Sequence, residues 1–432
     1  MKKNNLFSEL SVEEVFEKNS LFWDYLSKNA YPLTKGEIRL PISIEPFEIT
    51  QSKFDILSEK LYLVISAGKK IVDNYFEDEN ISKALELCEK EKELFKLSKH
   101  EDFLGVVRGD LFYSENPKVV ELNTDFPDGF FMHDVTTEAL LFNLDRDKHS
   151  RLSHTNQFAK LILEVGNYES HIFVGYDRDR FFKDEFELSK LELQKLGFKN
   201  VYVGAIEDLA INSENYFSYN GTRIDILRRG TEISKFKDNE IFMKMLKVVL
   251  ENGTTKIINN FKMRLLGHKN LLSLLTNEKF HHYFNELEIN AIEELIPKTL
   301  SLMDVDVNDF LGCENKNDWV LKASDLAEGE NVYLGCDVSM ELWTSYVQKA
   351  KTEPIHWILQ EKVEIPETEF SIYNDKTKEV DKDVRKFDFN PHIMLYRDSI
   401  EFGNILVRFS SENVLNVMKG GGITYCLIKK DN

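Results

Sequence analysis

The sequence predicts a mixed fold of the α+β and α/β classes, built from several lobes. Up to about residue 100, apolar residues recur at spacings of three and four, which predicts helices in "SVEEVFEKNSLFWDYLSK" and "FDILSEKLYLVISAGKKIVDNYF". A strand-rich stretch, "VVRGDLFYSENPKVVELNTDFPDG", runs from Val106 to Gly129. Beyond Ser170, "HIFVGY", "ELSKLELQKLGF", "NVYVGAIEDL" and "TRIDILRRG" alternate strand and helix, as a small α/β lobe does.

Length and charge limit the classes of function. A chain of 432 residues exceeds one ordinary core, so two or three lobes are expected. The net charge of −19 supplies no broad basic face, which argues against nucleic acid as a partner. No run of about 18 apolar residues is present, and the acidic, amphipathic start lacks the apolar core of a signal peptide. We therefore expect a cytoplasmic protein with no membrane partner.

From about Asn259 onward the chain again mixes helices and strands. A helix with "LLGHKNLLSLL" precedes strand-like "DWVLKAS" and "NVYLG", a helix in "SMELWTSYVQKA", and strands in "HWILQEKVEI", "HIMLYRDSIEFGNILVRFS" and "GGGITYCLIKK". The polar tract between Ile372 and Asp388 has mixed charges, so we expect a mobile loop. The cysteines form no C-x-x-C pair, and all four are expected to be buried or half-buried free thiols: Cys88, Cys313, Cys336 and Cys426.

The strand-rich stretch predicts a β-hairpin with a polar face. If residues 114–117 form the turn, antiparallel pairing sets Asp110 opposite Glu121 and Arg108 opposite Asn123, all on one face. Two carboxylates beside an amide oxygen suit Mg²⁺, which keeps other positions for water and phosphate. An arginine beside them suits the same phosphate. A solvated polar hairpin is the alternative that the pattern leaves open.

The C-terminal half offers the other parts that a nucleotide site needs. Lys322 ends an apolar strand before a loop containing Gly329, and Lys269 begins a helix. A strand emerges into Gln360-Glu361-Lys362-Val363, where backbone groups can read an adenine edge. Each signal is weak alone, because a lysine at a strand end is commonly only solvated. Their order along the chain is more informative.

That order resembles the ATP-grasp enzymes. With "RGD" and "ELNTDFPDG" near the N-terminus, it is similar to the circularly permuted ATP-grasp group, which includes glutathionylspermidine synthase and related carboxylate–amine ligases. "NGTRIDILRRG" and "VRFSSENVLNVMKGGGI" extend the resemblance from roughly Gly105 to the end, leaving the first hundred residues uncovered. The loop "KASDLAEGEN" departs from the K-P and multiple glycines common in the group. Because glycines let backbone amides approach phosphate, this loop is expected to close differently or to bind ATP less tightly.

The resemblance implies an ATP-grasp fold with circular permutation, a small α/β pre-ATP-grasp lobe and a helical N-terminal region. The implied regions are 1–100 (helical), 101–150 (metal-binding hairpin of the catalytic lobe), 151–258 (pre-ATP-grasp-like lobe), 259–365 (ATP-binding lobe) and 366–432 (the rest of the catalytic lobe). The hairpin should then share one largely antiparallel sheet with the C-terminal strands, facing the Lys322 strand across a cleft.

The resemblance also implies activation of a carboxylate by ATP and attack of an amine on the acyl phosphate, with ATP and Mg²⁺ as cofactors. It assigns the metal to Asp110, Glu121 and Asn123, catalytic roles to Arg108 and Arg408, and nucleotide contacts to Lys269, Lys322, Gln360, Glu361, Lys362 and Val363. The implied partners are a small-molecule carboxylate, an amino acid or peptide, and an amine. A homodimer is left open.

Other residues carry weaker hypotheses. One of Arg228 and Arg229 is a candidate for binding a substrate carboxylate, and the glycines at 420–422, with Asn416 near them, either complete the pocket or form a tight turn. His133 and Asp134 either meet the amine or are structural. Asp125 and Asp128 are candidate helix caps. Two other functions stay open: a nucleotide-binding regulatory protein that has lost ligation, and a phosphotransferase that stops at a phosphorylated product.

Overall fold

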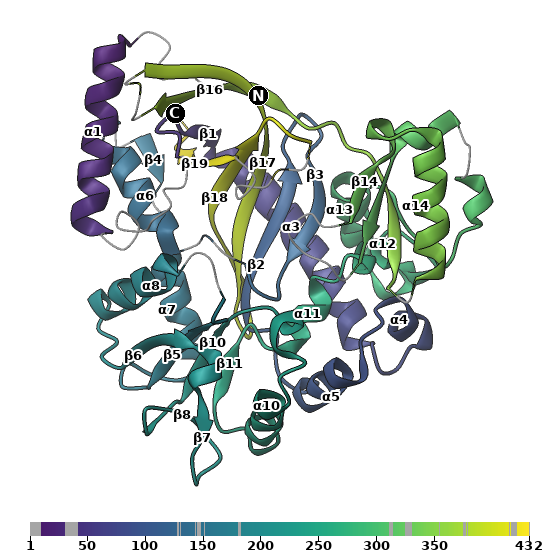
Figure 1. Ribbon diagram of the computed structural model, residues 1–432, viewed down its shortest axis with the longest axis horizontal. Helices are drawn as coiled ribbons and strands as arrows, with labels where there is room; N and C mark the ends of the chain where they lie inside the picture. Colours follow the sequence, from purple (N-terminus) through teal and green to yellow (C-terminus); the bar gives the residue numbers. More distant parts are fainter. Residues whose placement is uncertain are drawn as a thin grey trace.

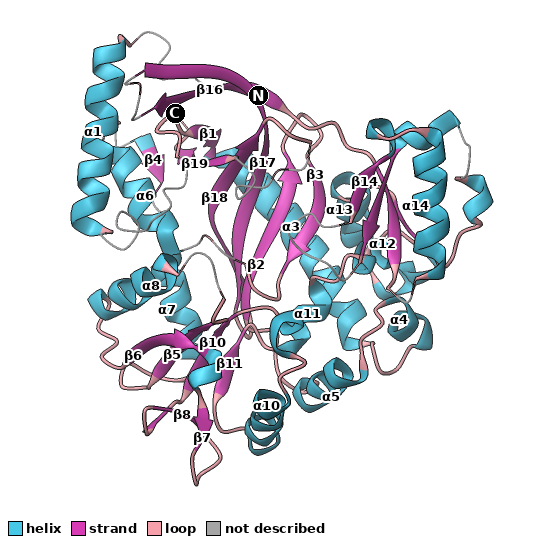
Figure 2. Cartoon of the chain, in the orientation of Figure 1, coloured by secondary structure: helices cyan, strands magenta, loops and turns pink. Residues whose placement is uncertain are grey.

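The structure is a computed structural model of the chain. It describes residues 10–30, 42–127, 129, 131–142, 144, 148–150, 152–179, 183–310, 314–324, 331–353, 355–374, 377, 379–413, 415 and 421–431. These residues form a mixed α/β fold in which a large central sheet is flanked by two smaller sheet-containing lobes (Figures 1 and 2). The predicted fold class is therefore confirmed.

The large sheet joins the beginning and the end of the chain. Its strand order is β1-β19-β18-β17-β2-β3, with β16 paired to β17 and β4 paired to β19. The strands are β1 (Phe47–Thr50), β2 (Gly105–Phe112), β3 (Lys118–Asn123), β4 (His149–Ser150), β16 (Glu367–Asn374), β17 (Glu379–Leu395), β18 (Ile400–Ser410) and β19 (Gly422–Lys429). Apart from the parallel β1–β19 pair, neighbouring strands run antiparallel. The hairpin and the C-terminal strands thus share one sheet, as the sequence predicts.

The two faces of this sheet bury different elements. On one face, α3 (Gln51–Asp73) packs its apolar stripe, including Leu61 and Val64, against sheet residues such as Phe389 and Val407. On the other face, α6 (Phe131–Phe142) packs against β18 and β19, and α1 (Val12–Asn29) packs against α6 and the β16–β17 hairpin. Helix α1 begins at a capping box formed by Ser11 and Glu14. The second face also carries the polar residues of the candidate site.

A smaller lobe with a four-stranded parallel sheet stands to one side, as expected for residues 170–229. Its order is β11-β10-β5-β6. Its elements are α7 (His154–Val165), β5 (Ile172–Tyr176), α8 (Asp184–Lys195), β6 (Val201–Ala205), β10 (Ile226–Gly230), α9 (Ile233–Phe236), α10 (Glu240–Asn252) and β11 (Lys256–Ile258). A short antiparallel sheet comprises β7 (Ala210–Ile211), β8 (Phe217–Tyr219) and β9 (Thr222–Arg223).

The second lobe carries the predicted nucleotide lysines on an antiparallel sheet and a nearby helix. The sheet has the order β12-β15-β13-β14, formed by β12 (Thr299–Ser301), β13 (Trp319–Ala323), β14 (Val332–Leu334) and β15 (Trp357–Glu361). Helix α14 (Met340–Thr352) buries Trp343 and Val347 against it. The remaining helices here and near the N-terminus are α4 (Glu79–Ala84), α5 (Glu89–Ser98), α11 (Phe261–Leu266), α12 (Asn270–Leu275) and α13 (Glu286–Leu295).

The prediction of a mobile loop between Ile372 and Asp388 is wrong for most of that tract. Strands β16 and β17 pair from Glu367–Lys386 to Asn374–Glu379, so this tract is chiefly a long hairpin. Charged residues are compatible with such a strand, because the main-chain groups form hydrogen bonds with the neighbouring strand and alternate side chains face solvent. Of the cysteines, Cys426 is buried as expected, Cys88 and Cys336 are exposed instead, and Cys313 lies outside the described residues.

Among the described helices, none has the length and apolar character needed to cross a lipid bilayer.

Candidate active site

The predicted hairpin has the predicted register. Arg108 pairs with Asn123 and Asp110 pairs with Glu121, and a β-bulge follows between Asp110 and Leu111. Direct cross-strand partners project to the same face of a sheet. The hairpin therefore presents two carboxylates, an amide and a guanidinium together, on the face opposite α3.

Asp110 is held by two arginines. Its Oδ1 accepts a hydrogen bond of 2.8 Å from Nε of Arg108, and its Oδ2 accepts bonds of 3.1 Å from Nη2 of Arg108 and 2.8 Å from Nη2 of Arg408. Arg408 also contacts Asp388, which lies opposite it on β17. A row of alternating charges, with buried carboxylates and half-buried guanidinium groups, thus crosses three neighbouring strands of the large sheet in the order Arg108–Asp110–Arg408–Asp388.

The alternation of charge sets the protonation states of these four side chains. Burial opposes ionisation of Asp110, but the charges of Arg108 and Arg408 lower its pKa to about 2. Burial raises the pKa of Asp388, and Arg408 opposes that rise. Burial alone would lower the pKa of Arg408, yet Asp110 and Asp388 raise it above its ordinary value. Asp110 is therefore ionised and Arg408 charged across the physiological pH range.

Two lysines approach the hairpin from the second lobe. Nζ of Lys269 lies 3.0 Å from Oε1 of Glu121, and Nζ of Lys322 lies 3.5 Å from the main-chain oxygen of Val120. The chain before Lys269 can approach the hairpin closely because residue 267 is a glycine. An added Cβ at Gly267 would lie only 2.4 Å from Oγ1 of Thr124. Burial lowers the pKa of Lys322 to about 8, and the charge of Glu121 partly offsets this effect. Both predicted lysines thus face the hairpin.

The hinge residues are largely engaged within the protein. Gln360 is buried and accepts a 2.6 Å hydrogen bond from Lys322, while its own amide group donates to Thr299. The main-chain N–H groups of Glu361 and Lys362 donate to the carbonyls of Lys298 and Asp318. The strand β15 ends at Glu361, so Lys362 and Val363 follow it as irregular chain. Their contact with an adenine remains a prediction.

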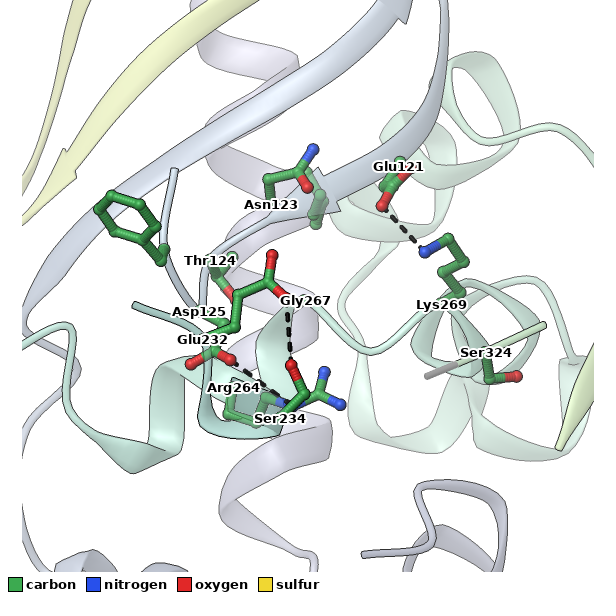
Figure 3. A pocket seen from close by; sticks show the side chains of 12 residues that line it. Glu121, Asn123, Thr124, Asp125, Glu232, Ser234, Arg264, Gly267, Lys269 and Ser324 are labelled. Atoms are coloured by element: carbon green, nitrogen blue, oxygen red, sulfur yellow. Dashed lines mark hydrogen bonds and ion pairs between the residues drawn. The ribbon is translucent and has the colours of Figure 1, made fainter. Parts of the chain in front are cut away.

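A small pocket of about 60 Å³ lies where β3 ends and the two lobes meet (Figure 3). Such a volume holds one functional group rather than a whole nucleotide. Its lining carries both signs of charge, with Arg264 placed 3.9 Å from an oxygen of Asp125. Burial raises the pKa of Glu232, and the charge of Asp125 adds to this effect. The lining residues are Glu121, Leu122, Asn123, Thr124, Asp125, Phe126, Glu232, Ser234, Arg264, Gly267, Lys269 and Ser324.

The donor set of the hairpin fits Mg²⁺ chemically. Asp110 and Glu121 offer hard oxygens, and the side chain of Glu121 is 27% exposed. Nδ2 of Asn123 is buried with no hydrogen-bond partner in the described part of the chain, and rotation of the amide would present its oxygen at the same place. Both carboxylates already have cationic partners, because guanidinium groups cover the oxygens of Asp110 and Lys269 lies 3.0 Å from Oε1 of Glu121. The metal assignment therefore remains a prediction.

Several weaker candidates have structural tasks. Arg229 is fully buried and bonds to main-chain oxygens and to Asp125, and Arg228 stacks on Phe126, so neither is displayed on the surface. Asp125 is not the N-cap of a helix; its carboxylate accepts a hydrogen bond from the main-chain N–H of Ile233 in α9, whose N-cap residue is Glu232. Four residues named in the sequence analysis lie outside the described residues: Asp128, Gly329, Asn416 and Gly420.

His133 and Asp134 lie apart from the pocket. His133 is buried beside His154, whose ring centroid lies 4.4 Å away, and Asp134 accepts hydrogen bonds from the first amides of α7. This arrangement supports the structural reading of both residues. Sequence reasoning missed Asp388, Arg264 and Glu232, none of which stands in a motif.

Comparisons with known proteins agree with the fold. The family model described as the AnkG N-terminal domain matches residues 57–215, which is less than half of the chain. No curated protein matches the chain at a significant level. Among solved structures, the chain resembles a glutathione synthetase-like effector (GSS30) from Globodera pallida in its apo form, with a TM-score of 0.66 and 13% identity, covering 97% of this chain and 98% of that one.

Two further structures are more distant. A putative gamma-glutamylcysteine synthetase from Methylobacillus flagellatus KT gives a TM-score of 0.43 at 12% identity, covering 82% of this chain and 85% of that one. The D-alanyl-alanine synthetase A from Vibrio cholerae O1 gives 0.29 at 8% identity, covering 61% and 89%. The chain thus has the mixed α/β fold of the glutathione synthetase-like effector along almost its whole length. The circular permutation stays a prediction.

Proposed function

We propose that the protein is an ATP-dependent ligase that joins the carboxylate of an amino acid or small peptide to an amine. The observation that carries this proposal is the convergence of Asp110 and Arg408 from the large sheet with Lys322 from a separate sheet. Asp110 and Arg408 are in contact, and the charge of Asp110 acts on Lys322. The fold likeness to a protein described as glutathione synthetase-like supports the same class.

The proposed chemistry needs charge neutralisation and positioning rather than a protein nucleophile. A carboxylate oxygen attacks the γ-phosphorus of ATP, and the bond to ADP breaks. The amine nitrogen then attacks the acyl carbon, inorganic phosphate leaves, and the amine loses a proton. Lys269 and Lys322 would balance the charge of the nucleotide phosphates. Arg108 and Arg408 would stabilise the transferred phosphoryl group and the oxyanion of the tetrahedral intermediate.

Mg²⁺ would be held by Asp110, Glu121 and Asn123, and it would neutralise the phosphate charge during transfer. The adenine and ribose would lie along residues 360–363, beside Lys322. The N-terminal position of the hairpin relative to these residues is the basis for proposing a circularly permuted ATP-grasp.

The small pocket is the proposed site of the substrate group that lies next to the reacting carboxylate. It presents the cationic side chain of Arg264 together with the carboxylates of Asp125 and Glu232. A substrate with both an ammonium and a carboxylate, such as an amino acid, complements this mixture of charges. The identities of the acid and the amine are left to experiment.

The direct test mixes candidate amino acids and amines with ATP, Mg²⁺ and the protein, and measures release of phosphate. Ligation requires phosphate release that depends on both an acid and an amine, together with a product of the summed mass less water. Release that depends on the acid alone would favour a phosphotransferase.

The second candidate function is a nucleotide-binding regulatory protein without ligase activity. One observation favours it: Asp110 already accepts three hydrogen bonds from two guanidinium groups. If ATP binds but no combination of acid and amine releases phosphate, this alternative replaces the ligase.

A further inference from the structure

Arg408 lies between two buried carboxylates that hold it unequally. Asp388 accepts from the main-chain N–H of Arg408 at 3.2 Å, from Nε at 3.1 and 3.3 Å, and from Nη2 at 2.5 Å. Asp110 receives one bond from Arg408, at 2.8 Å. The contact with Asp388 is also local, because the two residues face each other in the β17–β18 register. The single bond to Asp110 is therefore the easier one to break.

The environment of Asp388 reinforces this difference. Asp388 is only 2% exposed, and Nδ2 of Asn390, two residues along the same strand, donates to its Oδ1 at 2.6 Å. An ionised carboxylate buried this deeply requires a charged partner, and Arg408 supplies it. Arg408 cannot leave Asp388 without uncovering a buried charge, whereas Asp110 would still keep Arg108.

Asp110 has the opposite position in the network. A carboxylate offers about four lone-pair directions, and three hydrogen bonds from two cations already use most of them. A dication placed beside two guanidinium groups would be repelled unless phosphate oxygens arrived with it. Those oxygens would also accept the N–H groups that leave Asp110.

We propose that Asp388 is a positioning residue that keeps Arg408 in the site, and that the Arg408–Asp110 bond blocks a metal-binding carboxylate until a metal–nucleotide complex takes up the guanidinium. The inference rests on the proposed nucleotide site and goes beyond it, because it gives Asp388 and the Arg408–Asp110 bond a role in admitting the metal. By linkage, each ligand must strengthen the other by the same factor. Because a nucleotide also binds the metal through its own phosphate oxygens, coupling alone does not report on the Arg408–Asp110 bond, and the Arg408 variants test that bond.

The test measures binding of Mn²⁺, as a paramagnetic probe for Mg²⁺, by electron paramagnetic resonance with and without a non-hydrolysable ATP analogue. In the unmodified protein, the analogue should tighten Mn²⁺ binding by about tenfold or more. Arg408→Lys should bind Mn²⁺ alone several-fold more tightly than the unmodified protein. A lysine opposite Asp388 keeps the charge but lacks the fork that bridges to Asp110. Arg408→Gln should also bind Mn²⁺ alone more tightly than the unmodified protein.

Two variants separate the release of Asp110 from a general change of charge. Lys322→Met removes a nearby cation that makes no bond to Asp110, so its affinity for Mn²⁺ alone should rise less than that of Arg408→Lys. Asp388→Asn leaves Asp110 as the remaining carboxylate for Arg408, so Mn²⁺ alone should bind no better than to the unmodified protein, and the gain from the analogue should shrink. Asp388→Glu, which keeps the charge, should restore part of that gain. Exposed Arg397→Gln serves as the surface control.

The inference is overturned if folded Arg408→Lys and Arg408→Gln bind Mn²⁺ alone as weakly as the unmodified protein, or if the analogue does not tighten Mn²⁺ binding. Phosphate release measured in parallel separates this failure from that of the proposed function. Release without coupling removes the inference and keeps the ligase. Tighter binding of Mn²⁺ alone by the Arg408 variants, without phosphate release, keeps the inference and points to the nucleotide-binding alternative.

Discussion

Oε1 of Gln360 accepts a hydrogen bond of 2.6 Å from Nζ of Lys322, and the two residues come from the neighbouring strands β15 and β13. Gln360 is 1% exposed, and its Nε2 donates to Oγ1 of Thr299 at 3.1 Å. This relay fixes the lysine between its own sheet and the hairpin, where the main-chain oxygen of Val120 lies 3.5 Å away. The side chain of Gln360 therefore acts on the site through Lys322.

The first prediction concerns the pH dependence of nucleotide binding. Because burial lowers the pKa of Lys322 to about 8, its ammonium is charged below that pH and neutral above it. Affinity for an ATP analogue should therefore be highest below pH 8 and fall as the pH rises, by at most about tenfold per unit. Lys322→Met should bind more weakly at pH 7 and lose this dependence, whereas Lys322→Arg should keep its affinity at pH 9. If nucleotide affinity depended on pH in the same way in Lys322→Met and in the unmodified protein, Lys322 would not be the residue responsible for that dependence.

The second prediction concerns the hairpin. Glu121→Gln and Asn123→Ala should abolish turnover, because uncompensated phosphate charge costs several kcal/mol in the transition state. Glu121→Gln should also cost some stability, because Lys269 is buried and loses a charged partner, but the 27% exposure of Glu121 should keep that cost below the cost of breaking a fully buried pair. Phosphate release and urea unfolding measure the two effects. Glu294→Gln, an exposed residue paired with Lys60, is the matched control. Normal turnover in either hairpin variant would remove the metal assignment.

Local patterns were sufficient to predict the hairpin and its register. Alternation with period two and a turn near 114–117 predict the pairs Arg108–Asn123 and Asp110–Glu121, although the bulge after Asp110 shifts the pairing nearer the turn by one residue. The strand before Lys322 could be predicted in the same way, because it is a short apolar run. These features depend on neighbours in sequence, so sequence alone can reveal them.

Other features depend on contacts that sequence does not encode locally. Asp388 lies in a charged tract that resembles a loop, and only its pairing with Arg408 gives it a role. The strand β1 joins the large sheet by pairing with β19, which places Phe47 beside Cys426 across most of the chain. Arg264 occupies one polar position of a helix, which carries no sign that it faces a pocket.

The third prediction separates buried from exposed arginine pairs. Arg229 is completely buried, with Nη2 lying 2.5 Å from Asp125 and further bonds to main-chain oxygens. Arg229→Ala should reduce the free energy of unfolding by about 3–5 kcal/mol, because it leaves a largely buried carboxylate without its charged partner and several main-chain oxygens without hydrogen bonds. Arg223→Ala, which breaks the exposed pair with Asp225, should cost about 1 kcal/mol or less. Urea unfolding followed by circular dichroism measures both, and equal costs would contradict the prediction.

The last prediction concerns stability in acid. His133 of α6 and His392 of β17 are both fully buried on either side of His154. Burial lowers the pKa of His133 well below its ordinary value, and the charges of the neighbouring histidines add to this effect. Burial likewise lowers the pKa of His392, with contributions from His154 and Arg108. Both imidazoles are therefore neutral near pH 7.

The sign of the pH effect follows from these shifts. In the unfolded chain the two histidines take up protons near pH 6.5, whereas in the folded chain they do so only at lower pH. Below about pH 6.5 the unfolded state thus binds more protons, and stability falls as the pH is lowered, by up to about 1.4 kcal/mol per unit for each residue. The free energy of unfolding in urea should be clearly smaller at pH 5.5 than at pH 7.5. His392→Gln should reduce this difference, whereas His282→Gln, at an exposed position, should leave it unchanged. Equal differences in all three proteins would show that the buried histidines do not govern acid stability.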